Sequence, residues 1–462
     1  MLTKKVEIYT IISIFRIFKG GRVMKKQQTD IAVVGFALFS MFFGAGNLLF
    51  PPYLGLISGG SWLISLGGFI LADVGLSLLV ITAAAKCEGE LDTVLCRAGN
   101  IMAKLIGIAS VLCIGPLLAI PRTAATTYEM GISPIIGSTG TLAPVIVSIV
   151  FFGLTLFLTI RPSKVVDIIG KILTPALLIA LAVLIIIGII SPIGGVSEKA
   201  LIENSLFAEG VSQGYLTMDA LGAAALATVA ISSISERGYN NPKDKVKLTL
   251  KAGLVAGLAL TLVYGGLTYL GSTLSTAYGV DTPQASLMVV ITNSLLGYPG
   301  KLVLCIIVSL ACLTTAIGLT SASAKYFASI SNNKIKYETV VIVVCLFSAV
   351  VSNFGVSTII KFSAPVLEIV YPVLIALVVM TIFGEKIKND NAFKGAGYVT
   401  LFVSLLSVLS NLLSINQIRD LLNLLPFASI GFNWILPAIV GAIIGGFIKN
   451  KSDYEKQLSK YA

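Results

Sequence analysis

The chain has 462 residues, of which 56% are hydrophobic and 12% are charged, and its mean hydropathy is +0.94. Because a water-soluble domain carries about 25% charged residues, this composition excludes a soluble protein and indicates a chain that lies in a lipid bilayer. The net charge of +11 is spread along the chain, so no nucleic-acid partner is predicted, and the absence of histidine excludes an imidazole base, proton relay or metal ligand.

Twelve apolar segments approach the roughly 20 residues that a helix needs to cross a bilayer. They lie near residues 31–58, 62–85, 105–130, 142–160, 172–192, 216–235, 248–272, 302–328, 339–353, 357–383, 397–415 and 430–448. The predicted fold class is therefore an all-α integral membrane protein with 12 transmembrane helices. An even number of spans places both termini on the same side of the membrane.

The basic residues predict which side that is. With the N-terminus inside, 28 of the 33 lysine and arginine residues fall in the tails and loops of the cytoplasmic side. Short loops rich in lysine and arginine prefer that side, so both termini are predicted to be cytoplasmic.

Two features receive no predicted function. Residues 1–23 are basic and partly apolar and contain no signal-peptide cleavage site. They are expected to lie outside the fold. They form either an amphipathic surface segment or a stretch upstream of the true start. The cysteines have no metal-ligand spacing and are expected to be reduced and buried. They are Cys87, Cys96, Cys113, Cys305, Cys312 and Cys345.

The first span contains signals that break a helix. It carries Gly44-Ala45-Gly46-Asn47 in its middle, and Pro51 and Pro52 follow. Inside a membrane a broken helix is tolerated only where it faces protein or a cavity, and the free carbonyls and N–H groups at such a break attract cations and anions. Glycines used only for close helix packing are the alternative, but the asparagine and the prolines favour a break.

The sixth span carries Asp219 near its middle. Placing an aspartate at a helix centre costs ~3 kcal/mol on insertion scales, so an intramembrane acid indicates a functional site; the alternative is a helix-end aspartate that reaches the outer surface. Breaks in spans one and six, five apart, indicate a transporter built from an inverted repeat. The predicted parts are the extension 1–23, two five-helix repeats over 24–195 and 196–385, and two further helices with the tail over 386–462.

Three segments resemble a known family: Phe39–Gly55 (FSMFFGAGNLLFPPYLG), Gly115–Gly131 (GPLLAIPRTAATTYEMG) and, more weakly, Trp434–Gly441 (WILPAIVG). They are similar to segments of the bacterial branched-chain amino acid carriers of system II, which have a leucine-transporter-like fold. The resemblance runs from about Met24 to the C-terminus. It implies a secondary transporter, not an enzyme, that imports leucine, isoleucine and valine across a bacterial cell membrane with sodium as the coupling ion.

The resemblance also implies a sodium site between the first and eighth spans. Its oxygens would come from the carbonyls of Ser40, Phe43 and Ala311 and from the hydroxyls of Thr314 and Thr315. Positions i, i+3 and i+4 share one helix face, although a threonine pair in a membrane helix is otherwise usually bonded to its own backbone.

The same resemblance places an amino acid at the two breaks. Its carboxylate would meet the N–H groups of Ala45 and Gly46 at the start of the second half of helix one, and its ammonium group would face the unwound sixth helix. Related neurotransmitter-type transporters have threonine and serine where this chain has Thr217 and Asp219, so the aspartate departs from the family pattern. Asp219 is therefore either a direct ammonium contact or a proton site. The predicted substrate-binding residues are Phe42, Phe43, Gly44, Ala45, Gly46, Asn47, Thr217, Asp219, Leu221 and Gly222.

Four further ionisable residues, Asp73, Arg122, Glu129 and Glu368, lie in apolar stretches. Arg122 and Glu129 are two helical turns apart on one face, which predicts a structural pair or an extracellular gate, and Glu368 is a second candidate partner for Arg122. Bending is expected at Arg122, which follows Pro121.

Other functions fit the sequence less well. Proton coupling through Asp219 or Glu368, or transport of another small apolar solute, is the nearest alternative. An intramembrane hydrolase needs an aspartate pair in a GxGD context or serine with histidine, a channel needs a filter loop or a ring of several copies, and an ATP-driven pump needs a phosphate-binding loop. No obligatory protein partner is inferred; the expected partners are the substrate and the bilayer.

Overall fold

The structure is a computed structural model that describes residues 26–87, 91–137, 140–160 and 164–448. The predicted extension 1–23 and most of the C-terminal tail lie outside the described residues. The described part is built from helices and their connections, without a β-strand. The first helix covers residues 26–42 and has no label.

The labelled α-helices are long in most of the chain and short at the breaks. In the first half they are α2 (Ala45–Ser58), α3 (Trp62–Ile70), α4 (Leu76–Cys87), α5 (Leu91–Leu95), α6 (Asn100–Leu112), α7 (Ala119–Thr126), α8 (Ser133–Ile136), α9 (Leu142–Ile160) and α10 (Lys164–Ile190). In the second half they are α11 (Leu206–Tyr215), α12 (Asp219–Glu236), α13 (Pro242–Ser272), α14 (Gln284–Ile330), α15 (Tyr337–Val351), α16 (Val356–Ile382), α17 (Asp390–Leu412), α18 (Asn416–Asn423) and α19 (Ile435–Phe447).

Short 3-10 and π turns join or interrupt these helices. They are η1 (Gly59–Ser61), η2 (Leu71–Gly75), η3 (Cys96–Ala98), η4 (Cys113–Leu117), η5 (Thr127–Ile132), η6 (Ser352–Phe354), η7 (Gly384–Lys386) and η8 (Ala428–Ile430). The π turn η4 corrects the sequence analysis of helix three, which expected the bend at Pro121 and Arg122. The helix kinks at Gly115, whose backbone is not helical and which precedes Pro116, whereas Pro121 lies inside α7 without a break beside Arg122.

All twelve predicted spans fall on helical structure. By length and apolar composition, eight helices in the described part could cross a membrane, or nine if α11 and α12 form one span. The apolar stretch Pro175–Ile190, which is the later part of α10, and the apolar helix α19 (Ile435–Phe447) are shorter. The number of twelve crossings therefore stays a prediction. The sequence analysis missed the first part of α14, which precedes a non-helical Gly297.

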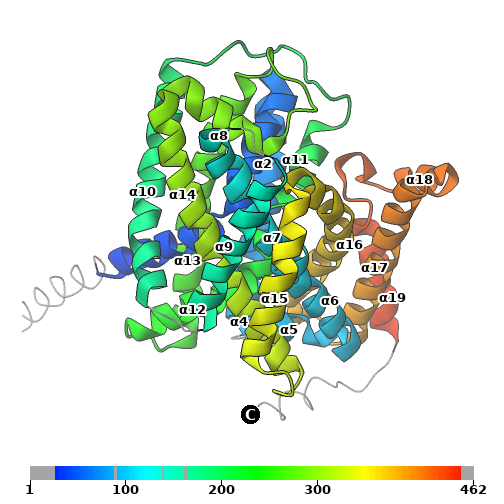
Figure 1. Cartoon of the computed structure of the whole chain (residues 1–462). Helices are drawn as coiled ribbons and strands as arrows, with labels where there is room; N and C mark the ends of the chain where they lie inside the picture. Colours follow the sequence, from blue (N-terminus) through cyan, green and yellow to red (C-terminus); the bar gives the residue numbers. More distant parts are fainter. Residues whose placement is uncertain (1–25, 88–90, 138–139, 161–163, 449–462) are drawn as a thin grey trace, which may run out of the picture.

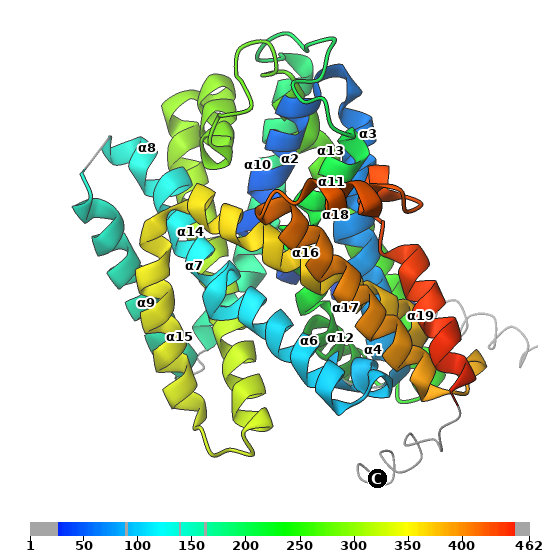
Figure 2. The ribbon, with the colours of Figure 1, turned by 90° about the vertical axis from the view of Figure 1, so that its right-hand side faces the viewer.

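Figure 2 shows α9 and α15 side by side at one edge of the bundle and α19 at the other. The outer face of α9 is apolar and exposed: Ile146, Ile149 and Phe157 keep 60%, 63% and 63% of their surface. These residues share one face of the helix. Such a face is stable against lipid tails and would be costly in water.

Glycines let the inner helices touch backbone to backbone. A β-carbon on Gly55 of α2 would lie 1.8 Å from the carbonyl oxygen of Thr268 in α13, and one on Gly271 would lie 1.9 Å from that of Pro52. Gly68 of α3 and Gly210 of α11 approach the facing helix in the same way. Small residues allow this close packing, which drives helix association in a membrane. These contacts hold two half-helices in place: α2, which follows the break of helix one, and α11, which precedes the break of helix six.

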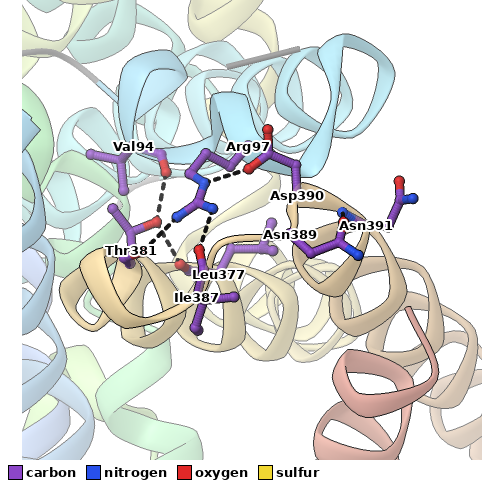
Figure 3. Close-up of polar contacts among 9 residues, drawn as sticks. Val94, Arg97, Leu377, Thr381, Ile387, Asn389, Asp390 and Asn391 are labelled. Carbon is purple, nitrogen blue, oxygen red and sulfur yellow. Dashed lines mark hydrogen bonds and ion pairs between the residues drawn. The ribbon is translucent and has the colours of Figure 1, made fainter. Parts of the chain in front are cut away.

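Figure 1 shows α17 and α19 next to each other at the side of the molecule. An arginine ties this side to the bundle, as Figure 3 shows. Arg97 of η3 donates from Nε to Asp390 (2.6 Å), from Nη1 to the carbonyl of Gly384 (2.9 Å) and from Nη2 to that of Ile387 (2.5 Å). Its guanidinium also lies 4.1 Å from the ring centre of Phe393. The planar fork of arginine suits such a multiple contact.

All six cysteines are free, as predicted, but only Cys113, Cys312 and Cys345 are buried. Cys87, Cys96 and Cys305 are half-buried, so the expectation that all six are buried is wrong.

Candidate functional site at two helix breaks

The first helix breaks where the sequence predicts it. The helix over 26–42 ends before Phe43 and Gly44, and α2 begins at Ala45. The N–H of Gly44 donates to Oδ1 of Asn47 at 3.0 Å, which orders the turn. The last carbonyls of one half-helix and the first N–H groups of the other therefore have no partner in a helical ladder. Gly46 and Asn47 lie in the first turn of α2, after the gap.

The sixth helix breaks as well, between Tyr215 and Asp219, and its halves α11 and α12 meet at an angle of 50°. Met218 adopts a left-handed backbone with φ of 67°. This conformation is uncommon for a residue other than glycine and is concentrated at functional sites. Asp219 is the first residue of α12, where the helix dipole favours a negative charge.

Asn47 connects the two breaks directly. Its Nδ2 donates to Oδ2 of Asp219 at 2.9 Å and also to the hydroxyl of Tyr264 in α13. Asp219 is therefore turned into the bundle, and the alternative of an aspartate that reaches the outer surface is wrong. The sequence analysis placed Asn47 among the substrate-binding residues but did not predict its contact with Asp219, and no local signal marked Tyr264.

Arg122 of α7 lies between the same two breaks. Its Nη1 donates to the carbonyl of Leu216 at 2.6 Å and its Nη2 to that of Thr217 at 3.4 Å, and only 3% of its surface is exposed. A β-carbon on Gly46 would lie 2.9 Å from Nη2. The guanidinium thus satisfies free carbonyls of helix six beside the start of α2, which explains why position 46 carries no side chain.

The predicted ion pairs of Arg122 are not formed. Glu129 accepts a hydrogen bond from the N–H of Val356 at the start of α16 (2.8 Å), and Glu368 is exposed on α16. Within the described residues the ion pairs are Arg97–Asp390 and Arg237–Asp30. Pairing of Arg122 with Glu129 or Glu368 is therefore wrong for this structure, because the guanidinium is directed at backbone carbonyls. A role of these residues as a gate stays a prediction.

Asp73 is a site residue that the sequence analysis noted but did not assign. It lies in the π turn η2 and is 1% exposed, and its Oδ1 accepts a hydrogen bond from Oγ1 of Thr217 at 2.6 Å. The π turn widens the helix locally, a feature often found at functional sites. The only sequence signal for Asp73 was a carboxylate in an apolar run.

The residues predicted to bind sodium come from two helices that meet. A β-carbon on Gly44 would lie 3.6 Å from Oγ1 of Thr315, so this hydroxyl of α14 stands beside the break of helix one. Oγ1 of Thr314 donates to the carbonyl of Ala311 at 3.0 Å. That bond uses the proton of Thr314 and leaves its oxygen lone pairs for a cation. The hydroxyl of Ser40 donates to the carbonyl of Ala37 at 2.9 Å.

The apolar residues predicted to line the site are buried near the breaks. Phe42 and Leu221 are 5% and 3% exposed, and the ring of Phe43 stacks on those of Phe39 (5.4 Å) and Tyr264 (6.5 Å). A β-carbon on Gly222 would meet no atom within 4 Å. Gly222 therefore borders open space next to Asp219.

A polar strap that the sequence analysis missed joins the N-terminal part of the first helix to the chain just after α12. Asp30, in the helix over 26–42, accepts hydrogen bonds from Nη1 of Arg237 (2.8 Å) and from the hydroxyl of Tyr239 (3.0 Å), both just after α12. It therefore holds this end of the first helix to the end of α12.

Replacing Asp30 by asparagine should loosen this end. Because the ion pair is partly exposed, we expect a loss of about 1 kcal/mol, which makes amide hydrogen exchange in residues 26–42 roughly five times faster. Hydrogen exchange measured by mass spectrometry tests this expected increase. Glu236→Gln is the control, because Glu236 is an exposed carboxylate one residue before Arg237. Equal exchange in both variants would show that the strap does not hold the helix.

Comparison with known proteins decides the family. Residues 27–452 match the family described as branched-chain amino acid transport protein. The chain belongs to this family. It is 35% identical over 441 residues to the branched-chain amino acid permease BraB of Bacillus subtilis, across 93% of this chain and 98% of the relative. It is 39% identical over 438 residues to a putative branched-chain amino acid carrier protein of Staphylococcus aureus, across 90% and 97%.

Solved structures support the fold. The nucleobase-cation-symport-1 family transporter Mhp1, closed with bromovinylhydantoin bound, matches with a TM-score of 0.57 at 14% identity over 94% of this chain and 96% of its own. A sodium-coupled sialic acid symporter matches with a TM-score of 0.56 at 12% identity over 92% and 91%. The family member is thus a multi-pass membrane transport protein, not an enzyme, with the predicted leucine-transporter-like fold. The division into repeats at 195 and 385 stays a prediction.

Proposed function

We propose that this chain imports branched-chain amino acids into a bacterial cell by symport with sodium, with both termini in the cytoplasm. The observation that carries the proposal is the direct connection of two helix breaks by Asn47 and Arg122 in a chain of this family. The printed names of the relatives supply the substrate class. The sialic acid symporter among the similar folds is sodium-coupled.

The site has complementary groups for both ends of an amino acid. The free N–H groups of Ala45 and Gly46 at the start of α2 suit its carboxylate, and the nearby guanidinium of Arg122 adds positive charge. Asp219 suits its ammonium group across the gap. The buried Phe43 and Leu221 offer an apolar lining for a branched side chain, where one methylene is worth only about 1–3 kcal/mol. Such a lining accepts leucine, isoleucine and valine alike.

Sodium enters this proposal as a co-transported substrate. The free carbonyls at the end of the helix over 26–42, with the hydroxyls of Thr314 and Thr315 beside Gly44, form a set of hard oxygen ligands. A cation there would hold helix one against α14. Occupancy of both sites then favours closure, and rocking of one helix bundle against the other exposes them to the opposite side.

Counterflow in proteoliposomes tests the proposal. Vesicles loaded with unlabelled leucine should accumulate labelled leucine when sodium is present, and isoleucine and valine should compete. Potassium in place of sodium at fixed pH should abolish the accumulation. Failure of isoleucine and valine to compete would contradict the substrate assignment, and accumulation that ignores sodium would contradict the coupling ion in favour of the proton alternative through Asp219.

A further inference from the structure

A set of exposed residues in the first half of α13 lies on one face of the helix. It consists of three lysines followed by three leucines, spaced by three or four positions: Lys243, Lys247, Lys251, Leu254, Leu258 and Leu262. At 3.6 residues per turn, these six positions share about one third of the helix circumference. We refer to them as the lysine–leucine face.

This face is open to the surroundings of the protein. Leu254, Leu258 and Leu262 keep 55%, 67% and 76% of their surface. Farther along α13 the helix is covered, because a β-carbon on Gly266 would lie 2.5 Å from Cδ1 of Ile185 in α10. Within the described residues, the three lysine side chains make no ion pair or hydrogen bond. Both the apolar and the charged part of the face are therefore available to a ligand.

The apolar part of the face has the length of one lipid leaflet. Tyr264, two residues after Leu262, contacts Asn47 at the break of helix one, and breaks of this kind lie near the bilayer midplane. With a rise of 1.5 Å per residue, Leu254 lies about 15 Å and Lys251 about 20 Å from the level of Tyr264. Half of the hydrocarbon core measures about 15 Å, and the headgroups extend to about 20–22 Å. The leucines thus span the acyl chains, and Lys251 lies among the headgroups.

The charged part of the face suits an anion. Three lysines and one exposed carboxylate, Asp244, leave it with a net charge of +2. A general preference of lysine for the cytoplasmic side would be met by lysines anywhere at this end of the molecule. Here they continue the line of the leucines, so one ligand with an anionic head and apolar tails can contact both parts. Lys247 lies one turn beyond Lys251, and its flexible stem brings its ammonium group within reach of the same head.

The lysine–leucine face borders the first helix, drawn in dark blue beside α13 in Figure 1. A β-carbon on Gly35 would lie 2.7 Å from Cβ of Val255 and 2.9 Å from the carbonyl oxygen of Ala252. Val33 and Phe36 of the first helix are 46% and 49% exposed. Acyl chains along the leucines of α13 would therefore lie next to the half-helix that ends at the candidate site.

We propose that the lysine–leucine face binds one anionic phospholipid of the cytoplasmic leaflet. Its phosphate lies at Lys247 and Lys251, and its acyl chains follow Leu254, Leu258 and Leu262. The inference goes beyond the proposed transport and takes from it only the orientation of the chain. The bound lipid supports the first helix where that helix packs on α13.

Lipid binding to the purified full chain in detergent tests the proposal. Phosphatidylglycerol is titrated, and native mass spectrometry counts the bound lipid, with neutral phosphatidylcholine as the comparison. The triple variant Lys243→Gln, Lys247→Gln, Lys251→Gln should bind the first phosphatidylglycerol about 100-fold more weakly, because each lysine near an anionic headgroup contributes about a factor of five. Phosphatidylcholine should bind more weakly than phosphatidylglycerol and should not distinguish the variant from the natural chain.

Two further variants make the test specific. Changing Lys325, Lys334 and Lys336 to glutamine removes the same charge from exposed positions at the same end of the molecule, and binding should change less than about threefold. Leu254→Ala with Leu258→Ala keeps all charges and removes apolar contact area, so binding should weaken about tenfold. All substituted side chains are exposed, and thermal unfolding checks that each variant is folded. If the first lysine triple did not fold, the leucine pair would decide.

Three results would overturn the inference. Equal weakening in both lysine triples would show that only the total charge matters, and equal affinity of the natural chain for the two lipids would exclude recognition of an anionic head. Competition by glycerol phosphate, a headgroup without tails, would make the ligand a soluble phosphate. None of these measurements involves leucine, so a failure of the proposed transport would be seen separately, as absence of counterflow.

Discussion

Replacing Thr314 and Thr315 together by alanine should raise the sodium concentration for half-maximal leucine uptake about 100-fold. Thr315 lies beside Gly44 at the break of helix one, and Thr314 is one turn beyond Ala311 on the same helix. Each hydroxyl lost from a cation costs about 1.5 kcal/mol or more, and a 100-fold change corresponds to about 2.7 kcal/mol. The maximal rate at saturating sodium should change much less.

The serine variants give the matched control. Changing Thr314 and Thr315 to serine removes two methyl groups but keeps both hydroxyls, so sodium dependence should stay near that of the natural chain. Uptake of labelled leucine over a sodium series measures both. If the alanine and serine pairs behave alike, the site is wrongly placed and the threonines serve only their own helix.

Replacing Arg122 by alanine should nearly abolish transport and destabilise the protein by about 3–5 kcal/mol, the usual cost of removing one partner from a buried charged network. The change leaves the carbonyls of Leu216 and Thr217 without their donor. It also removes the positive charge that faces Asp219. Thermal unfolding in detergent and leucine counterflow measure the two effects.

Two further variants separate the roles of Arg122. Arg122→Lys keeps the charge but loses the planar fork, so it should recover stability in part and transport poorly. Combining Arg122→Ala with Asp73→Asn removes one buried negative charge together with the positive one, and it should recover about 1–2 kcal/mol of the loss, a coupling that a double-mutant cycle detects. Additive losses would show that Arg122 acts only on the carbonyls and is independent of Asp73.

The features that the sequence predicted correctly are those that depend on neighbouring residues. The break of helix one follows from Gly44 and Gly46, because glycine has a low helix propensity, whereas Pro51 and Pro52 lie inside α2 after the break. The break at Met218 was predicted from Asp219, a carboxylate that a continuous apolar helix would not carry without cause. In both places the backbone departs from a helix within a few residues of the signal.

The errors and omissions concern contacts between distant residues. Arg122 and Glu129 share a helix face, which predicted a pair, yet Arg122 bonds carbonyls 94 and 95 positions away and Glu129 bonds an N–H 227 positions away. A buried guanidinium donates to the unsatisfied acceptors that tertiary packing places near it. The break of helix six leaves two such acceptors, the carbonyls of Leu216 and Thr217. Periodicity along one helix contains no information about those acceptors.

The sequence by itself determined that this chain lies in a membrane and that helices one and six are interrupted, because composition and helix breaking are local properties. Only the tertiary structure decided that Asn47 meets Asp219 across 172 positions and that Asp73 meets Thr217 across 144. Those meetings depend on the close packing of α2 on α13 and of α3 on α11 at glycines. Packing of this kind turns scattered polar residues into one site with a definite charge.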